Sequence, residues 1–131
     1  MHLLDTNICI YLLNSRSASL QDRVMAAGEL AISSVTYAEL CYGIENGSKK
    51  RAAECWSQLR LFKRLVQVLP IGEEVAVHYG KLRAELKRRG EMIGANDLFI
   101  AAHALSLGVV LVSNNEREFR RVRGLVVENW V

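Results

Sequence analysis

The chain alternates short, almost continuous apolar runs with longer stretches in which apolar residues recur every three or four positions. The short runs are typical of buried β-strands, and the periodic stretches are typical of amphipathic helices. This pattern predicts strands at residues 2–5, 30–33, 66–69, 109–112 and 125–127. Because the strand runs are apolar throughout, we expect the sheet to be covered on both faces.

Helices are predicted between these strands, over residues 8–13, 20–27, 35–46, 49–65, 73–89, 95–107 and 116–122. Thr6 and Asn7 are expected to cap the first helix, since short polar side chains favour that position. In the two longest helices the inward positions are expected to be Ala52, Cys55, Trp56, Leu59, Phe62 and Leu65, then Val77, Tyr79, Leu82 and Leu86.

Strands separated by helices predict an α/β fold. We expect a central, mostly parallel sheet of four to five strands flanked by helices, in a single domain over residues 1–131. In such sheets the binding crevice lies beyond the carboxyl ends of the strands. Residues that directly follow the strands are therefore the first candidates for chemistry.

Composition excludes several classes of protein. No apolar run approaches the roughly 18 residues that a membrane span needs, so no membrane partner is expected. The first residues carry no positive cluster and do not resemble a signal peptide, which favours a cytoplasmic location. The three cysteines contain no Cys-x-x-Cys pair, so neither a disulfide framework nor a cysteine zinc site is indicated.

The net charge of +3 is unevenly distributed. Residues 1–48 contain two basic and five acidic residues, whereas residues 49–64 contain six basic residues and one acidic residue. Residues 81–91 contain five basic and two acidic residues. This distribution indicates a polyanionic partner beside an acidic site, the alternative being that the basic runs are solvated faces of amphipathic helices.

Acidic residues recur at the predicted carboxyl edge of the sheet. Asp5 ends the first strand, Glu39 lies near the start of the helix after the second strand, and Asp97 begins the helix before the fourth strand. The segment after the fourth strand adds Ser113, Asn114, Asn115, Glu116 and Glu118. The sequence therefore predicts that acids distant along the chain meet at one edge.

Each acid also has a purely structural explanation. Asp5 is placed to cap the following helix, and Asp97 is favoured near a helix start by the helix dipole, with Asn96 as the cap. The spacing Thr36-x-x-Glu39 matches a capping box. Glu116 and Glu118 have a structural explanation too: they can form ion pairs with Arg120 and Arg121 on a solvated helix.

Carboxylates held close together repel one another unless one binds a proton or a cation lies between them. Oxygen ligands suit Mg²⁺ or Mn²⁺, whereas the three histidines show no paired zinc-ligand spacing. The chain has no Gly-x-Ser-x-Gly nucleophile elbow and no phosphate-binding glycine loop. It also lacks the acidic pair and late lysine expected of a phosphoacceptor signalling domain. A magnesium cluster beside basic helices favours phosphodiester hydrolysis.

Four ordered motifs resemble those of the PIN-domain ribonucleases, and among these the VapC toxins of bacterial toxin–antitoxin pairs. The motifs are Leu3-Leu4-Asp5-Thr6-Asn7, Ile32-Ser33-Ser34-Val35-Thr36-x-x-Glu39-Leu40, Gly94-x-x-Asp97-x-x-Ile100-Ala101 and Val112-Ser113-Asn114-Asn115-x-x-Glu118-Phe119. The resemblance covers essentially the whole chain. It implies the three-layer PIN fold.

The resemblance also implies residue roles. Asp5 and Asp97 are implied as the main metal ligands, with Glu39 completing the acidic cluster directly or through water. Glu118 is the expected fourth catalytic acid, although Glu116 and Asn115 stay open for that position. Thr6, Asn7, Ser113 and Asn115 are expected to bind substrate or support the acids; Ser113 departs mildly from the threonine common there.

The implied activity is Mg²⁺- or Mn²⁺-dependent endoribonuclease cleavage of RNA by a toxin. Resemblance to one branch points to tRNA, specifically the anticodon loop of initiator tRNA. The implied partners are a VapB-like antitoxin, a second copy of the chain in a homodimer, and operator DNA through the antitoxin complex. The apolar surfaces of helices 8–13 and 49–65 are candidates for the protein contacts, the alternative being that they serve only ordinary core packing. The alternative is a non-catalytic module that binds nucleic acid or protein.

Overall fold

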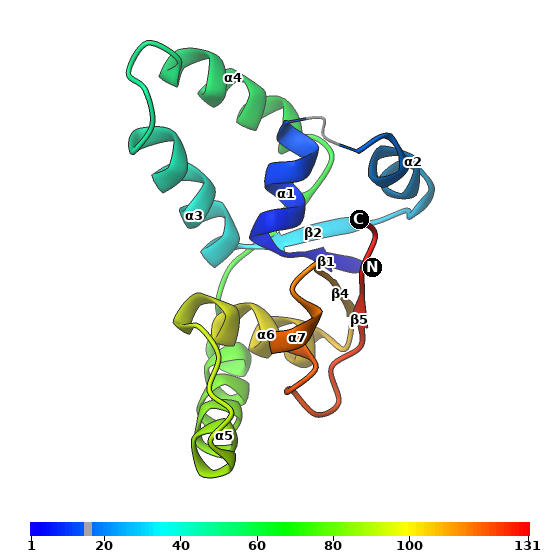
Figure 1. Ribbon diagram of the computed structural model, residues 1–131, viewed down its shortest axis with the longest axis vertical. Helices are drawn as coiled ribbons and strands as arrows, with labels where there is room; N and C mark the ends of the chain where they lie inside the picture. The colour runs from blue at the N-terminus through cyan, green and yellow to red at the C-terminus, as the bar shows by residue number, and fades with distance from the viewer. Residues whose placement is uncertain (15–16) are drawn as a thin grey trace.

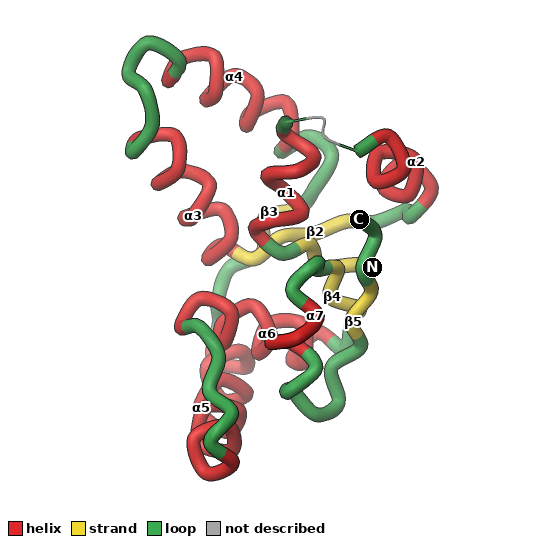
Figure 2. The backbone as a smooth tube through the Cα atoms, in the orientation of Figure 1, coloured by secondary structure: helices red, strands yellow, loops and turns green. Residues whose placement is uncertain are grey.

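A computed structural model describes residues 1–14 and 17–131. Five strands form one sheet (Figure 2). Their order is β3-β2-β1-β4-β5, and every neighbouring pair is parallel. The strands are β1 (His2–Leu4), β2 (Leu30–Ser33), β3 (Gln67–Leu69), β4 (Val110–Val112) and β5 (Val127–Glu128). The predicted α/β class is confirmed.

Helices cover both faces of the sheet, which makes three layers. They are α1 (Thr6–Leu13), α2 (Ala18–Ala26), α3 (Ser34–Glu45), α4 (Ala52–Phe62), α5 (Glu73–Arg89), α6 (Ala95–Leu107) and α7 (Glu116–Phe119). Helices α1 to α4 lie on one side of the sheet, and α5 to α7 lie on the other (Figure 1).

The two faces of the sheet supply two hydrophobic clusters, because successive strand residues point to opposite sides. Leu4 and Ile32 pack with residues of α1, α2, α3 and α4. Leu3 and Leu111 pack with residues of α5, α6 and α7. This double burial accounts for the continuous apolar strands in the sequence.

Some predicted positions are wrong in detail. The helix expected over 49–65 begins only at Ala52 and ends at Phe62, so Leu65 lies beyond it and is 58% exposed. Val77 is 55% exposed because it lies two positions from the buried Val75, on nearly the opposite side of α5. The last strand is shifted to 127–128 by its pairing with β4.

Two further observations concern membrane-spanning helices and the cysteines. Within the part that the structure describes, no helix combines the length and apolar character needed to cross a bilayer. All three cysteines are free thiols; Cys9 is buried, and Cys41 and Cys55 are half-buried.

The core around α4 provides a matched test of this packing. Leu59 is 1% exposed and Leu61 is 59% exposed on the same helix. Leu59→Ala should lower the free energy of unfolding by about 2–5 kcal/mol, since it leaves a cavity. Leu61→Ala should change it by less than about 0.5 kcal/mol. Urea denaturation measures both, and equal losses would contradict the assigned orientation of α4.

Candidate active site

The carboxyl ends of β1, β2 and β4 meet at one edge of the sheet, and the acidic residues gather there. Asp5 directly follows β1, and its backbone N–H donates to the carbonyl of Val112 at the end of β4 (3.0 Å). A cleft of about 740 Å³ opens at this edge. Its lining residues are Asp5, Thr6, Asn7, Ile10, Val35, Ala38, Glu39, Tyr42, Asn96, Asp97, Phe99 and Asn115.

Asp5 is the most buried of the acids, with 3% of its surface exposed. Its Oδ1 accepts from the N–H of Ile8 at 2.9 Å and so caps α1, while Oδ2 accepts a short hydrogen bond from Ser113 Oγ. Burial raises the pKa of Asp5, and these hydrogen bonds partly oppose the rise. The capping explanation for Asp5 is therefore correct, and it is compatible with a place in the cleft. Thr6 begins α1 rather than capping it.

Glu39 is half-buried and turned toward the neighbouring helix. Its Oε1 accepts from Thr6 Oγ1 at 2.6 Å, and Thr36 Oγ1 lies 3.3 Å from the same hydroxyl. The capping-box interpretation of Glu39 is wrong, because Ser33 caps α3 three residues before Thr36. Thr6 thereby holds Glu39 at the cleft from the adjacent element.

Asp97 lies in the first turn of α6, whose N-cap is Gly94 rather than Asn96. Its pKa is raised to about 7, first by burial, then by Glu118, and further by the charges of Asp5 and Glu39. The pKa of Glu118 is lowered, mainly because it accepts a hydrogen bond from Asp97. In the absence of a cation, these opposite shifts favour a proton on Asp97 rather than on Glu118 at pH values below about 7.

The segment after β4 positions Glu118. Asn115 Nδ2 donates to Glu118 Oε2 at 2.6 Å, and the N–H of Asn115 donates to Ser113 Oγ at 2.9 Å. Glu116 instead pairs with Arg120 at 2.8 Å on an exposed surface. The ion-pair explanation thus holds for Glu116, whereas Glu118 lies beside Asp97.

Several cleft residues were not predicted from the sequence, although a signal was present. Val35, Ala38 and Tyr42 lie on the same side of α3 as Glu39. Val35 and Tyr42 are four residues before and three after Glu39, and Ala38 is three residues after Val35 and four before Tyr42. Phe99 lies two residues after Asp97 and stacks on Tyr79, with ring centroids 4.2 Å apart. These residues give the acidic cleft an aromatic and aliphatic wall.

The donor set suits a hard divalent cation. Among residues 1–14 and 17–131, no three His, Cys, Asp or Glu side chains are grouped tightly enough to enclose an ion. Glu39 is turned to Thr6, and Asp97 is turned to Glu118. Even so, the four carboxylates act on one another electrostatically, and carboxylate oxygens are the ligands that Mg²⁺ and Mn²⁺ prefer. A cation at the cleft would relieve the repulsion that, together with burial, raises the pKa of Asp97.

Comparisons with known proteins identify relatives over nearly the whole chain. A family model described as "PIN domain" matches residues 2–125. "Ribonuclease VapC2" of Haemophilus influenzae is 42% identical over 131 residues, covering 99% of this chain and 98% of that protein. "tRNA(fMet)-specific endonuclease VapC" of Shigella flexneri is 41% identical over 129 residues, covering 98% of this chain and 96% of that protein.

A solved structure shows the same fold. The structure of "VapBC2 from Rickettsia felis bound to a DNA fragment from their promoter" contains a chain that matches with a TM-score of 0.93 and 36% identity. The match covers 99% of this chain and 98% of that chain. The predicted resemblance and the predicted three-layer fold are both confirmed. The chain belongs to the PIN-domain family of VapC ribonucleases.

Proposed function

We propose that this chain is the toxin of a toxin–antitoxin pair and that it hydrolyses RNA phosphodiester bonds as a metal-dependent endoribonuclease. The observation that carries the proposal is the gathering of Asp5, Glu39, Asp97 and Glu118 around the edge where the strands end. Relatives named as ribonucleases match nearly the full chain and support the same activity.

Asp5 and Asp97 would be the principal ligands of Mg²⁺ or Mn²⁺, with Glu39 as a third ligand, direct or through water. Such an ion supplies a bound water of lowered pKa and neutralises negative charge on the leaving oxygen. Ser113 holds Asp5 in place, and Thr6 does the same for Glu39. As a ligand, Asp97 would be deprotonated, because metal ligands must be deprotonated.

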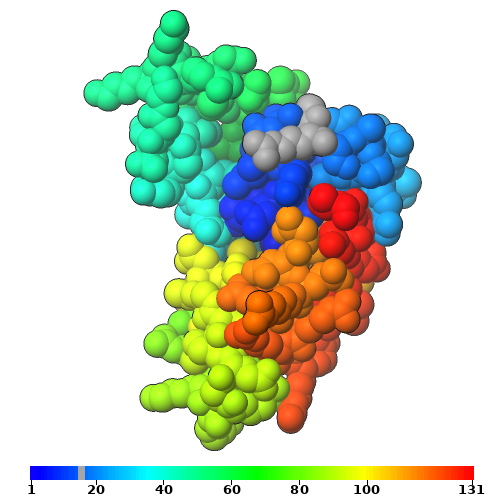
Figure 3. Space-filling model, viewed as in Figure 1, coloured from blue at the N-terminus to red at the C-terminus, as the bar shows by residue number. Residues whose placement is uncertain are grey.

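Glu118 would complete the acidic cluster, with Asn115 orienting it through the 2.6 Å hydrogen bond. Asn7 is exposed at the cleft and is placed to contact substrate. Basic residues lie in the α3–α4 connection and along α5, two segments at opposite ends of the molecule (Figure 3). Their positive charge would attract the phosphate backbone toward a cleft whose own charge is negative.

The proposed substrate is tRNA, and within that class the anticodon loop of initiator tRNA. The similar proteins of Shigella flexneri and Salmonella typhimurium are both named tRNA(fMet)-specific endonucleases. Their identity to this chain is 41% and 38%. The target is carried by this likeness together with the basic surfaces.

The proposed protein partner is a VapB-like antitoxin, since similar chains are solved in VapBC complexes, two of them bound to DNA. A groove of about 250 Å³ runs between α1, α3 and α4 beside Glu39. Its wall is mostly apolar and includes Ile10, Leu13, Leu40, Ile44 and Leu59. An antitoxin segment docked there would block the cleft. A homodimer, and operator DNA bound through the antitoxin complex, complete the proposed assembly.

The first test measures the metal dependence of RNA cleavage and the contribution of each acid to it. RNA cleavage should stop in EDTA and return with Mg²⁺ or Mn²⁺. Asp5→Ala and Asp97→Ala should each lower kcat/KM by about 100-fold or more, above the range for outer-shell partners. Glu118→Gln should lower it at least about tenfold, whereas the matched Glu116→Gln should stay within about twofold of wild type. Gel assays of labelled RNA, with the antitoxin removed, measure these rates.

Full cleavage by Asp5→Ala or Asp97→Ala would refute the assigned ligands. Binding of tRNA without cleavage in either metal would favour the non-catalytic module. Equal effects of Glu116→Gln and Glu118→Gln would remove the distinction between the two acids.

The raised pKa of Asp97 predicts a pH-dependent loss of stability in metal-free protein. The folded pKa is about 7 and the ordinary value is 3.8, so the folded state binds more protons between these limits. Stability should therefore fall as pH rises through this window. The lowered pKa of Glu118 acts in the opposite direction, but only below its ordinary value of 4.5.

Asp97→Asn should remove this loss of stability and raise Tm near neutral pH by a few degrees. A gain of about 1 kcal/mol in the free energy of unfolding produces a shift of that size in a domain of this length. Solvent screening limits the gain because Asp97 is half-buried. Asp22→Asn, an exposed change on α2, is the control. Scanning calorimetry in EDTA and in Mg²⁺ should show the difference shrinking when the ion is present. The Tm of the wild type should fall relative to that of Asp97→Asn as pH rises from 4 to 7. An unchanged difference between the two Tm values over this range would contradict the account.

The proposed target predicts selective cleavage. In a mixture of deacylated tRNAs, initiator tRNA should be cut within its anticodon loop at least about tenfold faster than elongator methionine tRNA. Sequencing of RNA ends after brief incubation measures the rates and sites. Equal cutting of both tRNAs would leave the ribonuclease assignment intact and refute the proposed target.

A further inference from the structure

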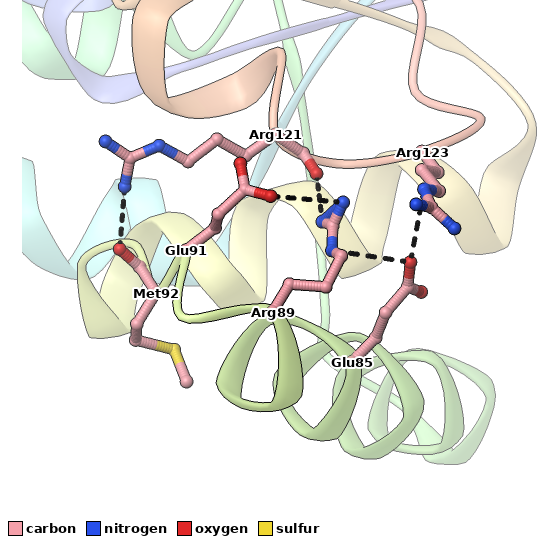
Figure 4. A network of polar contacts seen from close by, with 6 residues as sticks. All are labelled: Glu85, Arg89, Glu91, Met92, Arg121 and Arg123. Carbon is pink, nitrogen blue, oxygen red and sulfur yellow. Dashed lines mark hydrogen bonds and ion pairs between the residues drawn. The ribbon is translucent and has the colours of Figure 1, made fainter.

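Two arginines link segments on the α5–α7 side of the sheet (Figure 4). Arg89, at the end of α5, donates through Nη2 to the carbonyl of Arg121, just after α7. Arg121 donates through Nη1 to the carbonyl of Met92 at 2.9 Å, in the connection between α5 and α6. The two contacts fasten the end of α5, the connection and the segment after α7 to one another.

Carboxylates surround the inner arginine. Glu85 Oε1 lies 3.8 Å from Arg89 Nε and 3.7 Å from Arg123 Nε, and Glu91 Oε1 lies 3.7 Å from Arg89 Nη1. The side chain of Arg89 is 21% exposed, compared with 76% for Arg123. Arg89 is therefore the enclosed centre of the network, and ion pairs compensate its charge.

The same two segments meet a second time at the cleft. The α5–α6 connection ends at Gly94, which caps α6 three residues before Asp97, and its N–H lies 3.4 Å from Glu118 Oε1. Arg121 follows Glu118 by three residues. The Asp97–Glu118 contact is repulsive once both groups are ionised, whereas the contacts of Arg89 and Arg121 involve backbone carbonyls and hold without a cation.

We infer that Arg121, supported by Arg89, is a positioning residue that fixes Glu118 against Asp97 by fastening the segment after α7 to the α5–α6 connection. The inference rests on the proposed roles of Asp97 and Glu118. The charge of Arg121 also acts on Glu118, as in the sequence-based alternative, but the side-chain hydrogen bond of Arg121 goes to the Met92 carbonyl. A second role for a basic residue near a nuclease cleft is direct contact with RNA phosphate, and the experiment distinguishes the two.

The test compares Arg121→Gln with Arg120→Gln. Arg120 is a neighbouring residue whose side chain is 72% exposed and pairs with Glu116. In Arg121→Gln, the affinity for Mn²⁺ should fall about tenfold, as loss of an outer-shell partner does. Paramagnetic broadening of amide resonances measures this affinity without RNA. The kcat for RNA cleavage should fall about tenfold, with KM within about twofold.

Two further readouts separate positioning from other roles. Backbone amide exchange at 94–97 should accelerate in Arg121→Gln, and Arg89→Gln should produce the same acceleration. Arg121→Lys should recover most of the Mn²⁺ affinity, since it keeps one donor for the Met92 carbonyl. If Arg121→Gln fails to fold, Arg121→Lys and Arg89→Gln carry the comparison.

A change confined to KM and to the salt dependence of binding would make Arg121 a phosphate contact and overturn the inference. So would Mn²⁺ affinity, kcat and amide exchange that match those of Arg120→Gln. Failure of the proposed function has a different signature. The wild-type chain would then cleave no RNA in either metal, or Asp97→Ala would cleave it normally, while amide exchange at 94–97 would still report on Arg121.

Discussion

Negative charge gathered at one edge of a parallel sheet is the constraint on which the rest of this structure depends. Parallel strands end together, so whatever follows β1, β2 and β4 must share a small space. Asp5 is 3% exposed there, and its charge adds to the cost of ionising Asp97. The surrounding fold offsets that cost with hydrogen-bond donors: the hydroxyls of Thr6 and Ser113, the amide of Asn115 and the first N–H groups of α1.

Asp5 shows how folding and chemistry share one side chain. One carboxylate oxygen caps α1, which stabilises the helix that packs against the sheet, and the other accepts from Ser113 after β4. An N-cap contributes roughly 1 kcal/mol. The acid is thus fixed from both neighbouring elements before any ligand is bound, which limits the reorganisation needed on binding. Repulsion between the carboxylates remains at Asp97. It lowers the stability of the metal-free fold, which is a common cost of a functional site.

The layout of the fold was predictable because it follows from local periodicity. Residues 30–33 form a strand and residues 73–89 form a helix, both with the predicted bounds. The strand is buried on both faces and leaves a continuous apolar run, whereas the helix is buried on one face and leaves a periodic pattern. The choice between two residues that both suit a role was not predictable where contacts with distant segments decide it. Ser33 and Thr36 both suit an N-cap, and Ser33 takes the role because β2 pairs with β3 through Ser33 and Leu69. The strand thus ends where its neighbour dictates, and Glu39 is left for the cleft.

The fourth acid shows the same limit. Glu116 and Glu118 are two residues apart, so α7 turns them to nearly opposite sides, and sequence alone does not say which side faces the cleft. Burial of Phe119 sets that rotation, and it places Glu118 beside Asp97 and Glu116 beside Arg120. A helix of four residues is not stable alone, because nucleation is not repaid over one turn. Its orientation therefore depends on tertiary contacts at Phe119 and at the segment that follows, and the geometry of the acidic cluster depends on groups well outside the cleft.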